Sequence, residues 1–155
     1  MTDLLIIAAE VLETAFPSNE YVPEGMIVPA RIETAQLGFL RPVFGKLYDK
    51  LGEEPYAAFC RTYIKPALAY YVRYLMVDEQ CAAIGAAGVR QNKSAYTEAV
   101  PDSRLHRLRR QARNDADTLL DKAIDYVENN PAMFPEYDPK ENIRRRVLIK
   151  GGFIL

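Results

Sequence analysis

The spacing of apolar residues along the chain predicts a mainly helical protein. Apolar positions recur at steps of three or four, which is the period of an amphipathic helix. The predicted helices cover residues 6–15, 25–40, 43–51, 56–84 and 102–129. A turn cluster follows the first of them at residues 16–19, Arg41-Pro42 predicts a kink or a break, and Gly52 is a plausible stop. We therefore expect a small helical bundle.

The segment 56–84 is apolar on most sides, which is typical of a helix at the centre of a bundle or at an interface. Pro66 is expected to divide it, because proline in a helix interior removes a hydrogen bond and clashes with the preceding turn. Its tyrosines could pack as core or line a subunit contact, and core packing is the ordinary outcome.

The clearest helix spans residues 102–129, with Asp102 or Ser103 as its cap and Asn130-Pro131 as its end. Its apolar positions form a narrow stripe: Leu105, Leu108, Ala112, Ala116, Leu119, Ala123 and Val127. We expect Leu105, Leu119 and Val127 to be largely buried in the core. Carboxylates on this helix, such as Asp117 and Asp121, are expected to be solvated surface groups.

Two segments depart from the helical period. Residues 85–101, which include Gly88 and Tyr96, form a long connection that we expect to be an irregular extended arm reaching a neighbouring subunit. The arginine-rich tail, residues 139–155, is expected to end in a short C-terminal strand around Gly151-Gly152.

The length of 155 residues suits one domain, residues 1–155, with a helical core over about residues 25–138. Apolar residues make up 49% and charged residues 26%, which is typical of a soluble globular protein. The net charge of −1 gives no strong positive field of the kind that a dedicated nucleic-acid binder carries. The charge is nevertheless uneven, because residues 1–60 hold nine acids and four bases.

The residues needed for common active sites are scarce. His106 is the one histidine, and Cys60 and Cys81 lie far apart without a metal-binding motif. We therefore expect no enzymatic activity, no metal and no cofactor. No apolar stretch approaches the roughly 20 residues of a membrane span and no positive region precedes the first apolar run, so we expect no membrane association and a cytoplasmic location.

Two arginine clusters are the most informative polar feature. Arg104, Arg107 and Arg110 lie in the first turns of the helix 102–129, and Arg144, Arg145 and Arg146 lie together in the tail. Arginine forks bind carboxylates and phosphates alike. The clusters could therefore dock onto a neighbouring subunit, contact DNA, or simply be solvated.

Several stretches resemble the small head-tail connector, or head-completion adaptor, proteins of tailed bacteriophages and prophages. Residues 39–51 (FLRPVFGKLYDKL) are similar to an aromatic/Leu-Pro-x-Leu-Gly-x-x-Leu-Tyr-Asp segment of that family, with Phe44 in place of the leucine before Gly45. Residues 65–71 (KPALAYY), the stretch from Gly88 to Leu105, residues 116–130 and the closing FPEY at 134–137 extend the resemblance.

The resemblance implies a structural virion assembly protein that forms a homo-oligomeric ring beneath the portal at the phage neck. Its implied partners are itself, the portal and the tail or neck proteins, with a weak contact to packaged DNA. The subunit or portal interface would use both arginine clusters together with Gly88 and Tyr96. The implied location is the cytoplasm of the bacterial host and, after assembly, the virion neck. The alternative is a small DNA-binding module that uses the arginine-rich helix 104–113.

Overall fold

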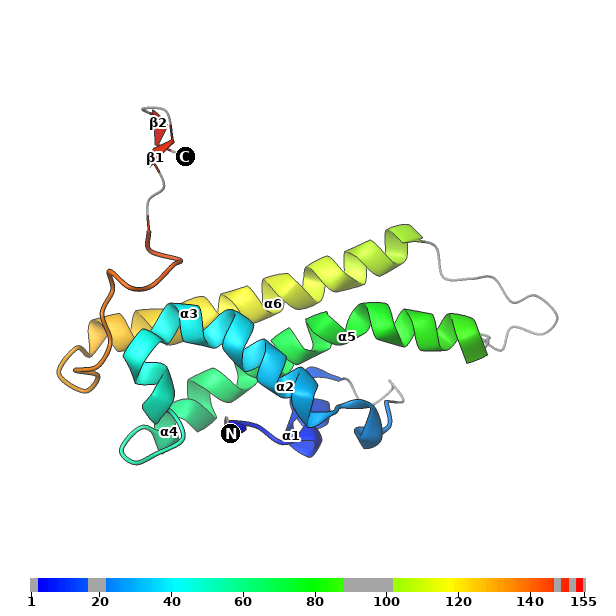
Figure 1. The fold of residues 1–155 in the computed structure, drawn as a ribbon, viewed down its shortest axis with the longest axis horizontal. Coiled ribbons are helices and arrows are strands. Elements are labelled where there is room, and N and C mark those ends of the chain that lie inside the picture. Colours follow the sequence, from blue (N-terminus) through cyan, green and yellow to red (C-terminus); the bar gives the residue numbers. More distant parts are fainter. Residues whose placement is uncertain (1–2, 17–21, 88–101, 147–148, 151–152, 155) are drawn as a thin grey trace.

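The computed structural model describes residues 3–16, 22–87, 102–146, 149–150 and 153–154, and it confirms a mainly helical fold (Figure 1). The α-helices are α1 (Ala8–Ala15), α2 (Pro29–Ala35), α3 (Arg41–Phe44), α4 (Ala57–Phe59), α5 (Lys65–Ala87) and α6 (Asp102–Asn129). Short 3-10 segments cover Glu24–Met26 and Gly45–Lys50. The bounds of α6 match those that the sequence predicts.

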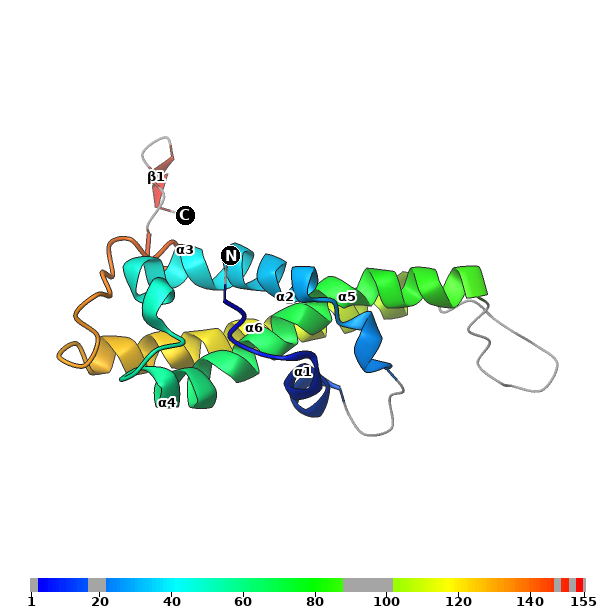
Figure 2. The same cartoon turned by 60° about the horizontal axis from the view of Figure 1, so that its bottom comes forward.

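The long helices α5 and α6 lie side by side and antiparallel along the length of the molecule (Figure 1). Helices α2 and α3 cover one side of this pair, and α1 packs on α5 from the other side (Figure 2). The apolar sequence of α5 follows from this position, because neighbours contact it on several sides. Leu68, Ala69 and Val72 are fully buried there.

Two prolines that were expected to break helices lie instead directly after turns of π-helix. The π-helical segments are Gln36–Leu40, which joins α2 to α3, and Cys60–Ile64, which joins α4 to α5. The next residue in each case, Arg41 or Lys65, donates its backbone N–H to the carbonyl five residues earlier. Proline then follows, and the wider turn accommodates a residue that has no N–H of its own to donate. The helical backbone therefore continues through both sites: the predicted division at Pro66 was wrong, and of the kink or break predicted at Arg41-Pro42 no break occurs.

A buried glutamine in the first π-turn fastens the N-terminal segment to the bundle. Gln36 is fully buried; its Oε1 accepts the Leu5 backbone N–H at 2.7 Å, and its Nε2 donates to the Asp3 carbonyl at 3.1 Å. The same Nε2 lies 3.1 Å from the Tyr48 hydroxyl oxygen, which accepts from it. Because all of these polar atoms are partnered, the buried amide carries no desolvation penalty of an unpaired group.

Aromatic rings close the end of the bundle where α6 meets α4. Tyr126 of α6 stacks on Tyr63 at a centroid distance of 4.5 Å and on Phe59 at 5.7 Å. Phe134, which follows α6, contacts Phe59 edge to face at 4.8 Å and stacks on Tyr56 at 5.5 Å. The chain after α6 is therefore part of the core rather than a loose extension.

The buried stripe of α6 contains Ala112, Ala116, Ala123 and Val127 as predicted, but it differs from the prediction at the leucines. Val127 is fully buried as expected, but Leu105 and Leu119 are only partly buried and Leu108 is 39% exposed. The buried positions are Ala112, Ala116, Leu120, Ala123, Ile124 and Val127. Steps of four from Ala112 through Ala116 to Leu120 therefore fit the α5 surface better than the step of three to Leu119.

The chain ends away from the helices. Two strands of two residues each, β1 (Ile149–Lys150) and β2 (Phe153–Ile154), pair antiparallel and stand clear of the helical body (Figures 1 and 2). The single strand predicted around Gly151-Gly152 is therefore not observed: two paired strands of two residues lie on either side of these glycines, which are outside the described residues. Helix α5 continues to Ala87, two residues past Gly85, and the rest of the expected arm, residues 88–101, lies outside the described residues.

Truncation of two adjacent leucines tests the phase of α6. Leu120→Ala should lower the free energy of unfolding by about 2–5 kcal/mol, because it leaves a cavity in a fully buried site. Leu119→Ala should cost about 1 kcal/mol, because that side chain is already partly solvated. Urea unfolding of both variants measures the difference, and a larger cost at Leu119 would contradict the observed packing.

Candidate interaction surface

Helix α6 carries its charges in two opposed halves. Residues 102–113 contain five arginines and one acid, whereas residues 114–129 contain five acids and one lysine. This order opposes the helix macrodipole, which favours acids near the N-terminus and bases near the C-terminus. Helix stability therefore does not account for the arrangement, and each half needs partners from elsewhere.

The acidic half finds its partners within the chain, and Asp117 is the centre of the network. Its Oδ1 accepts hydrogen bonds from the Tyr71 hydroxyl at 2.5 Å and from Arg144 Nη1 at 3.2 Å. Arg113, one turn earlier on α6, donates its Nε to Asp117 Oδ2 at 3.0 Å. Arg144 also holds Asp121, with Nη2 to Oδ1 at 2.7 Å. The expectation that Asp117 and Asp121 are merely solvated carboxylates was wrong.

The surroundings of Asp117 favour its ionised form. Burial opposes ionisation, but hydrogen bonds from Tyr71 and Arg113 and the positive charges of Arg113 and Arg144 outweigh it and lower the pKa of the carboxyl. Burial and the hydrogen bond to Asp117 raise the pKa of the Tyr71 hydroxyl. The network therefore consists of a carboxylate, a neutral phenol and two guanidinium groups.

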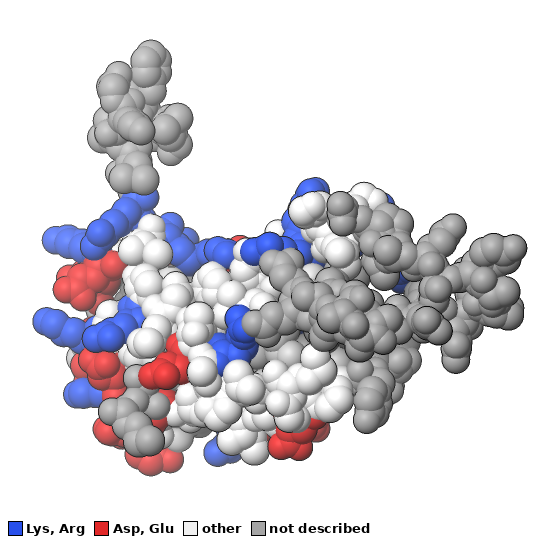
Figure 3. Space-filling model, turned by 45° about the vertical axis from the view of Figure 1, so that its right-hand side comes forward, with Lys and Arg blue, Asp and Glu red and all other residues white. Residues whose placement is uncertain are grey.

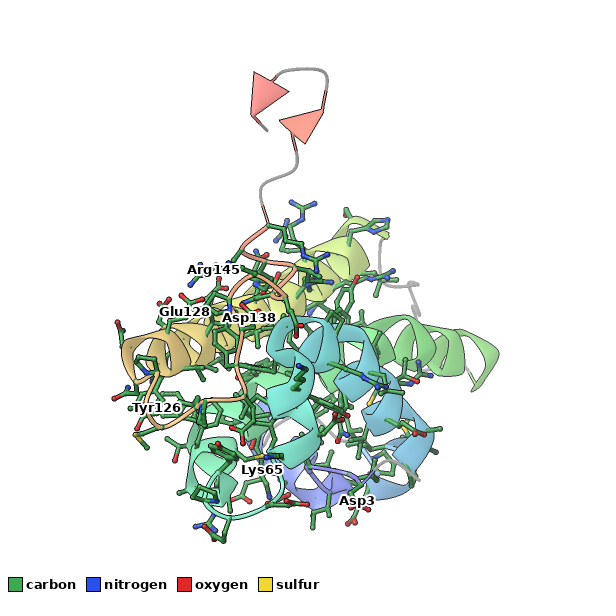
Figure 4. The ribbon with its side chains drawn as sticks, turned by 60° about the vertical axis from the view of Figure 1, so that its left-hand side comes forward. Asp3, Lys65, Tyr126, Glu128, Asp138 and Arg145 are labelled. Carbon is green, nitrogen blue, oxygen red and sulfur yellow. The ribbon has the colours of Figure 1, made fainter. Side chains whose placement is uncertain are left out.

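Arg145, the next arginine of the tail, also forms ion pairs with acids of α6. Arg145 Nη2 lies 3.0 Å from Asp125 Oδ1 and 3.1 Å from Glu128 Oε2, and Figure 4 shows Arg145 beside Glu128. Tyr137 donates its hydroxyl to Glu128 at 2.8 Å and accepts from the side-chain amide of the fully buried Asn142, also at 2.8 Å. Burial, together with Glu128, raises the pKa of Tyr137 to about 12 although the Asn142 bond opposes the shift.

A third contact joins the segment after α6 to the segment before α4. Glu136 accepts a hydrogen bond from Lys50 Nζ at 2.7 Å and another from the Tyr56 hydroxyl. These two donors lower the pKa of Glu136 to about 2. The Ile143 backbone N–H also donates to the Pro42 carbonyl at 3.3 Å. The segment from 130 to 146 is thus held at several points.

In the basic half of α6, two arginines lie on an aromatic shelf. Phe39 and Tyr71 stack at a centroid distance of 4.1 Å, and Arg113 lies 4.8 Å above the Phe39 ring. Arg109 lies 5.0 Å above the Tyr74 ring. Cation–π contact of this kind replaces part of the lost hydration of a guanidinium group.

The other three arginines of this half have no such support. Among the residues that the structure describes, Arg104, Arg107 and Arg110 are exposed and make no ion pair or hydrogen bond. We call them the arginine row. Lysine and arginine side chains gather along the upper edge of the molecule in Figure 3, and most acids lie to the left and below.

The arginines that the sequence analysis assigned to an interface thus fall into two groups, those with partners in the same chain and those without. Arg144 and Arg145 have acidic partners in the same chain, and Arg146 donates its Nε to the Lys140 carbonyl at 3.4 Å. The arginine row remains available to a partner. Gly88 and Tyr96, which were also expected at an interface, lie outside the described residues.

The described residues hold little that is suited to catalysis. His106 is exposed on α6, and burial raises the pKa of the Cys60 thiol to about 11. Within the described ranges, no three His, Cys, Asp or Glu side chains are grouped so as to hold a metal ion. In that same part of the chain, no helix combines the length and apolarity needed to cross a membrane.

A cavity of about 560 Å³ opens between the N-terminal segment, the π-turns and the turn before α4. Leu5, Leu37 and Leu51 line it, as does the buried Cys60. Its charged lining residues are Asp3, Arg41, Asp49, Glu53, Arg61 and Lys65. Lys65 is paired with Glu10 at 2.6 Å. The sequence analysis did not find this cavity, because its walls come from four separate segments.

These features define a helical domain whose residues 130–146 are held against its longest helix, with a set of arginines at one end that have no partner among the described residues. Residues 38–147 match a family of unknown function, DUF6712, and the chain belongs to that family. The matched region runs from the first π-turn to just beyond residue 146. No curated protein and no solved structure matches the chain.

The Asp117 network makes stability depend on pH. Asp117→Asn should lower the free energy of unfolding near neutral pH by about 1–3 kcal/mol, since it weakens bonds to three partly buried groups. The folded-state pKa lies below the ordinary value of 3.8, so the stabilisation is complete above pH 3.8 and is lost as the pH falls through the folded-state pKa.

Urea unfolding between about pH 2 and pH 6 measures this loss. The variant should show a flatter decline than the natural chain. Asp125→Asn is the matched control, because Asp125 is 65% exposed and its pair with Arg145 should contribute only about 0–1 kcal/mol. Equal costs for the two variants would contradict the central role of Asp117.

Proposed function

We propose that this chain is a structural subunit of a virion, a head-tail connector that assembles as a ring beneath the portal of a tailed bacteriophage. Its partners are other copies of itself, the portal and the tail or neck proteins, and it acts in the cytoplasm of the bacterial host and then in the virion neck. No catalytic step, metal or cofactor belongs to this function.

The observation that carries the proposal is the arginine row. Three exposed arginines that have no partner in the described part of the chain are costly next to one another on a helix, because like charges three or four residues apart repel. Their placement at a helix N-terminus adds to that cost. Such an arrangement is understandable if a negatively charged partner covers it after assembly.

The resemblance to connector proteins supports the same interpretation. Its segments coincide with features that shape the domain: residues 39–51 include the turn at Gly45, whose φ of 53° suits glycine, and residues 65–71 begin α5. Residues 134–137 contain Phe134 and Glu136, which close the aromatic end of the bundle.

A small DNA-binding module is the second candidate, and the same arginines favour it. Phosphates would satisfy guanidinium groups as well as carboxylates do. The two functions differ in their dependence on salt, because each neutralised phosphate releases counterions and makes duplex affinity fall linearly with log salt.

Reconstitution with the portal protein of the same genome tests the proposal. Mixtures of the two proteins should contain rings by mass measurement and negative-stain imaging. Replacing the arginine row by Glu should abolish the rings, whereas replacing it by Lys should only weaken them, because Lys keeps the charge and loses the bidentate fork.

Duplex DNA binding at two salt concentrations, measured on the same variants, separates the candidates. The connector should bind duplex weakly at physiological salt. Submicromolar affinity that the Glu replacements remove, together with absence of rings, would replace the connector by the DNA-binding module.

A further inference from the structure

We propose that the first turns of α6 dock into the cavity beside α4 on a second copy of the chain, so that copies associate head to tail. This inference rests on the proposed function in one respect, namely that copies of the chain contact one another. It adds the two surfaces that meet.

The inserted surface combines an apolar side chain with the arginine row. Leu108 is 39% exposed although it lies in the middle of a charged segment. Arg104 lies one turn before it on the helix, and Arg107 is its neighbour in the chain. An exposed leucine flanked by unpaired arginines needs a site with an apolar floor and an acidic rim.

The cavity has apolar lining and, on part of its rim, carboxylates; its charged lining is three acids and three bases in all. Leu5 and Leu37 supply accessible apolar lining, Leu37 being 36% exposed, whereas Leu51 beside them is fully buried. At the rim, Asp49 and Glu53 come from the turn before α4, and both are exposed without an ion pair among the described residues.

Asp3, from the N-terminal segment, is a third exposed carboxylate at the same cavity. Its backbone carbonyl is fixed by Gln36 Nε2, so the position of this part of the rim does not depend on a partner. Figure 4 shows Asp3 and Lys65 on the side of the molecule opposite the C-terminal hairpin.

The remaining charges of the cavity restrict how the helix can enter. Arg41 and Arg61 lie on the helical wall, and Lys65 on that wall is already paired with Glu10. These bases would repel the arginine row. The incoming helix is therefore expected to place Arg104 and Arg107 toward Asp49 and Glu53 and to keep them away from Arg41 and Arg61.

The two surfaces lie too far apart to meet within one molecule. Leu108 and Tyr126 lie 18 residues apart on α6, which is about 27 Å along its axis. Tyr126 packs against Phe59 of α4, and α4 and the first turns of α6 lie at opposite ends of the molecule (Figure 1). A contact between different surfaces on two copies is heterologous, and its repetition produces a ring or a filament.

Leu108 and the cavity together favour a second copy over nucleic acid as the occupant. A phosphate backbone would satisfy the arginines, but it offers no apolar surface to cover a leucine. It would also leave the carboxylates at the cavity rim without a role. A second copy accounts for both sets of groups at once.

A charge-swap experiment on the full chain tests the contact. One variant reverses the helix end, Arg104→Glu/Arg107→Glu, and the other reverses the rim, Asp49→Lys/Glu53→Lys. All four side chains are exposed, so both variants should remain folded by circular dichroism. Self-association is measured by sedimentation equilibrium at low salt, up to about 1 mM protein.

Each variant alone should associate at least about tenfold more weakly than the natural chain, and an equimolar mixture should recover most of the lost affinity. Recovery is expected because the two variants can alternate: the unaltered helix end of the rim variant meets the unaltered rim of the helix-end variant, and the reversed helix end meets the reversed rim. Leu108→Ala should weaken association without changing its salt dependence, since it removes apolar contact only.

Matched controls carry the same change in charge at other exposed positions. Lys46→Glu/Lys140→Glu corresponds to the helix-end variant, and Glu13→Lys/Glu24→Lys corresponds to the rim variant. Neither control should reproduce the loss, and their mixture should show no recovery beyond that of either control alone.

Three outcomes would overturn the proposed contact: a natural chain that stays monomeric at the highest concentration, a rim variant that associates normally, or a mixture that shows no recovery. Rings with the portal that survive both swaps would refute this contact while leaving the connector function intact. Recovery in the mixture without any ring on the portal would support the contact and refute the connector.

Discussion

The opposed charges of α6 are the constraint on which the rest of the surface depends. An acidic C-terminal half is unfavourable in an isolated helix, and here Arg144 and Arg145 compensate for it from the tail. The compensation has a structural consequence, because it holds residues 130–146 against the helix and brings Phe134 and Asn142 into the core. Within the described ranges, the basic half receives aromatic support at Arg109 and Arg113 and at no other arginine. The difference between the halves is what identifies the arginine row as a surface for a partner.

The two π-turns explain how the bundle and its cavity are built from the same helices. Each π-turn lets a helix continue past a proline, so α2 with α3, and α4 with α5, act as long continuous walls. Residues in or next to these turns, among them Leu37, Arg41 and Arg61, line the cavity. π-helical turns often occur at functional sites, because the extra residue changes where side chains point. In this chain each π-turn both packs into the core, through Leu40 and Ile64, and lines the cavity, through Leu37 and Arg61.

Local sequence signals predicted the helices well. They failed where residues distant in the chain determine which side chains are buried or paired. The spacing of apolar residues and the Asn130-Pro131 stop were enough to place α6, because both act within the helix. The same spacing could not choose between Leu119 and Leu120, since steps of three and four are equally helical and only the surface of α5 selects one. The proline rule failed at Pro42 and Pro66 because it assumes an α-helical hydrogen-bond pattern. Asp117 was overlooked because its partner Arg144 lies 27 residues away in the chain.

Charge segregation of this kind also determines which contacts between copies are disfavoured. Two arginine rows facing each other would repel, and so would two acidic rims, which makes symmetric head-to-head pairing unfavourable. Head-to-tail contact avoids both repulsions. In any row of associated copies it leaves one arginine row free at one end and one cavity rim free at the other. Because the charges are exposed, the preference should weaken as salt screens them. The apolar part of the contact, through Leu108, is not screened, and it supplies the affinity that exposed ion pairs alone provide only weakly.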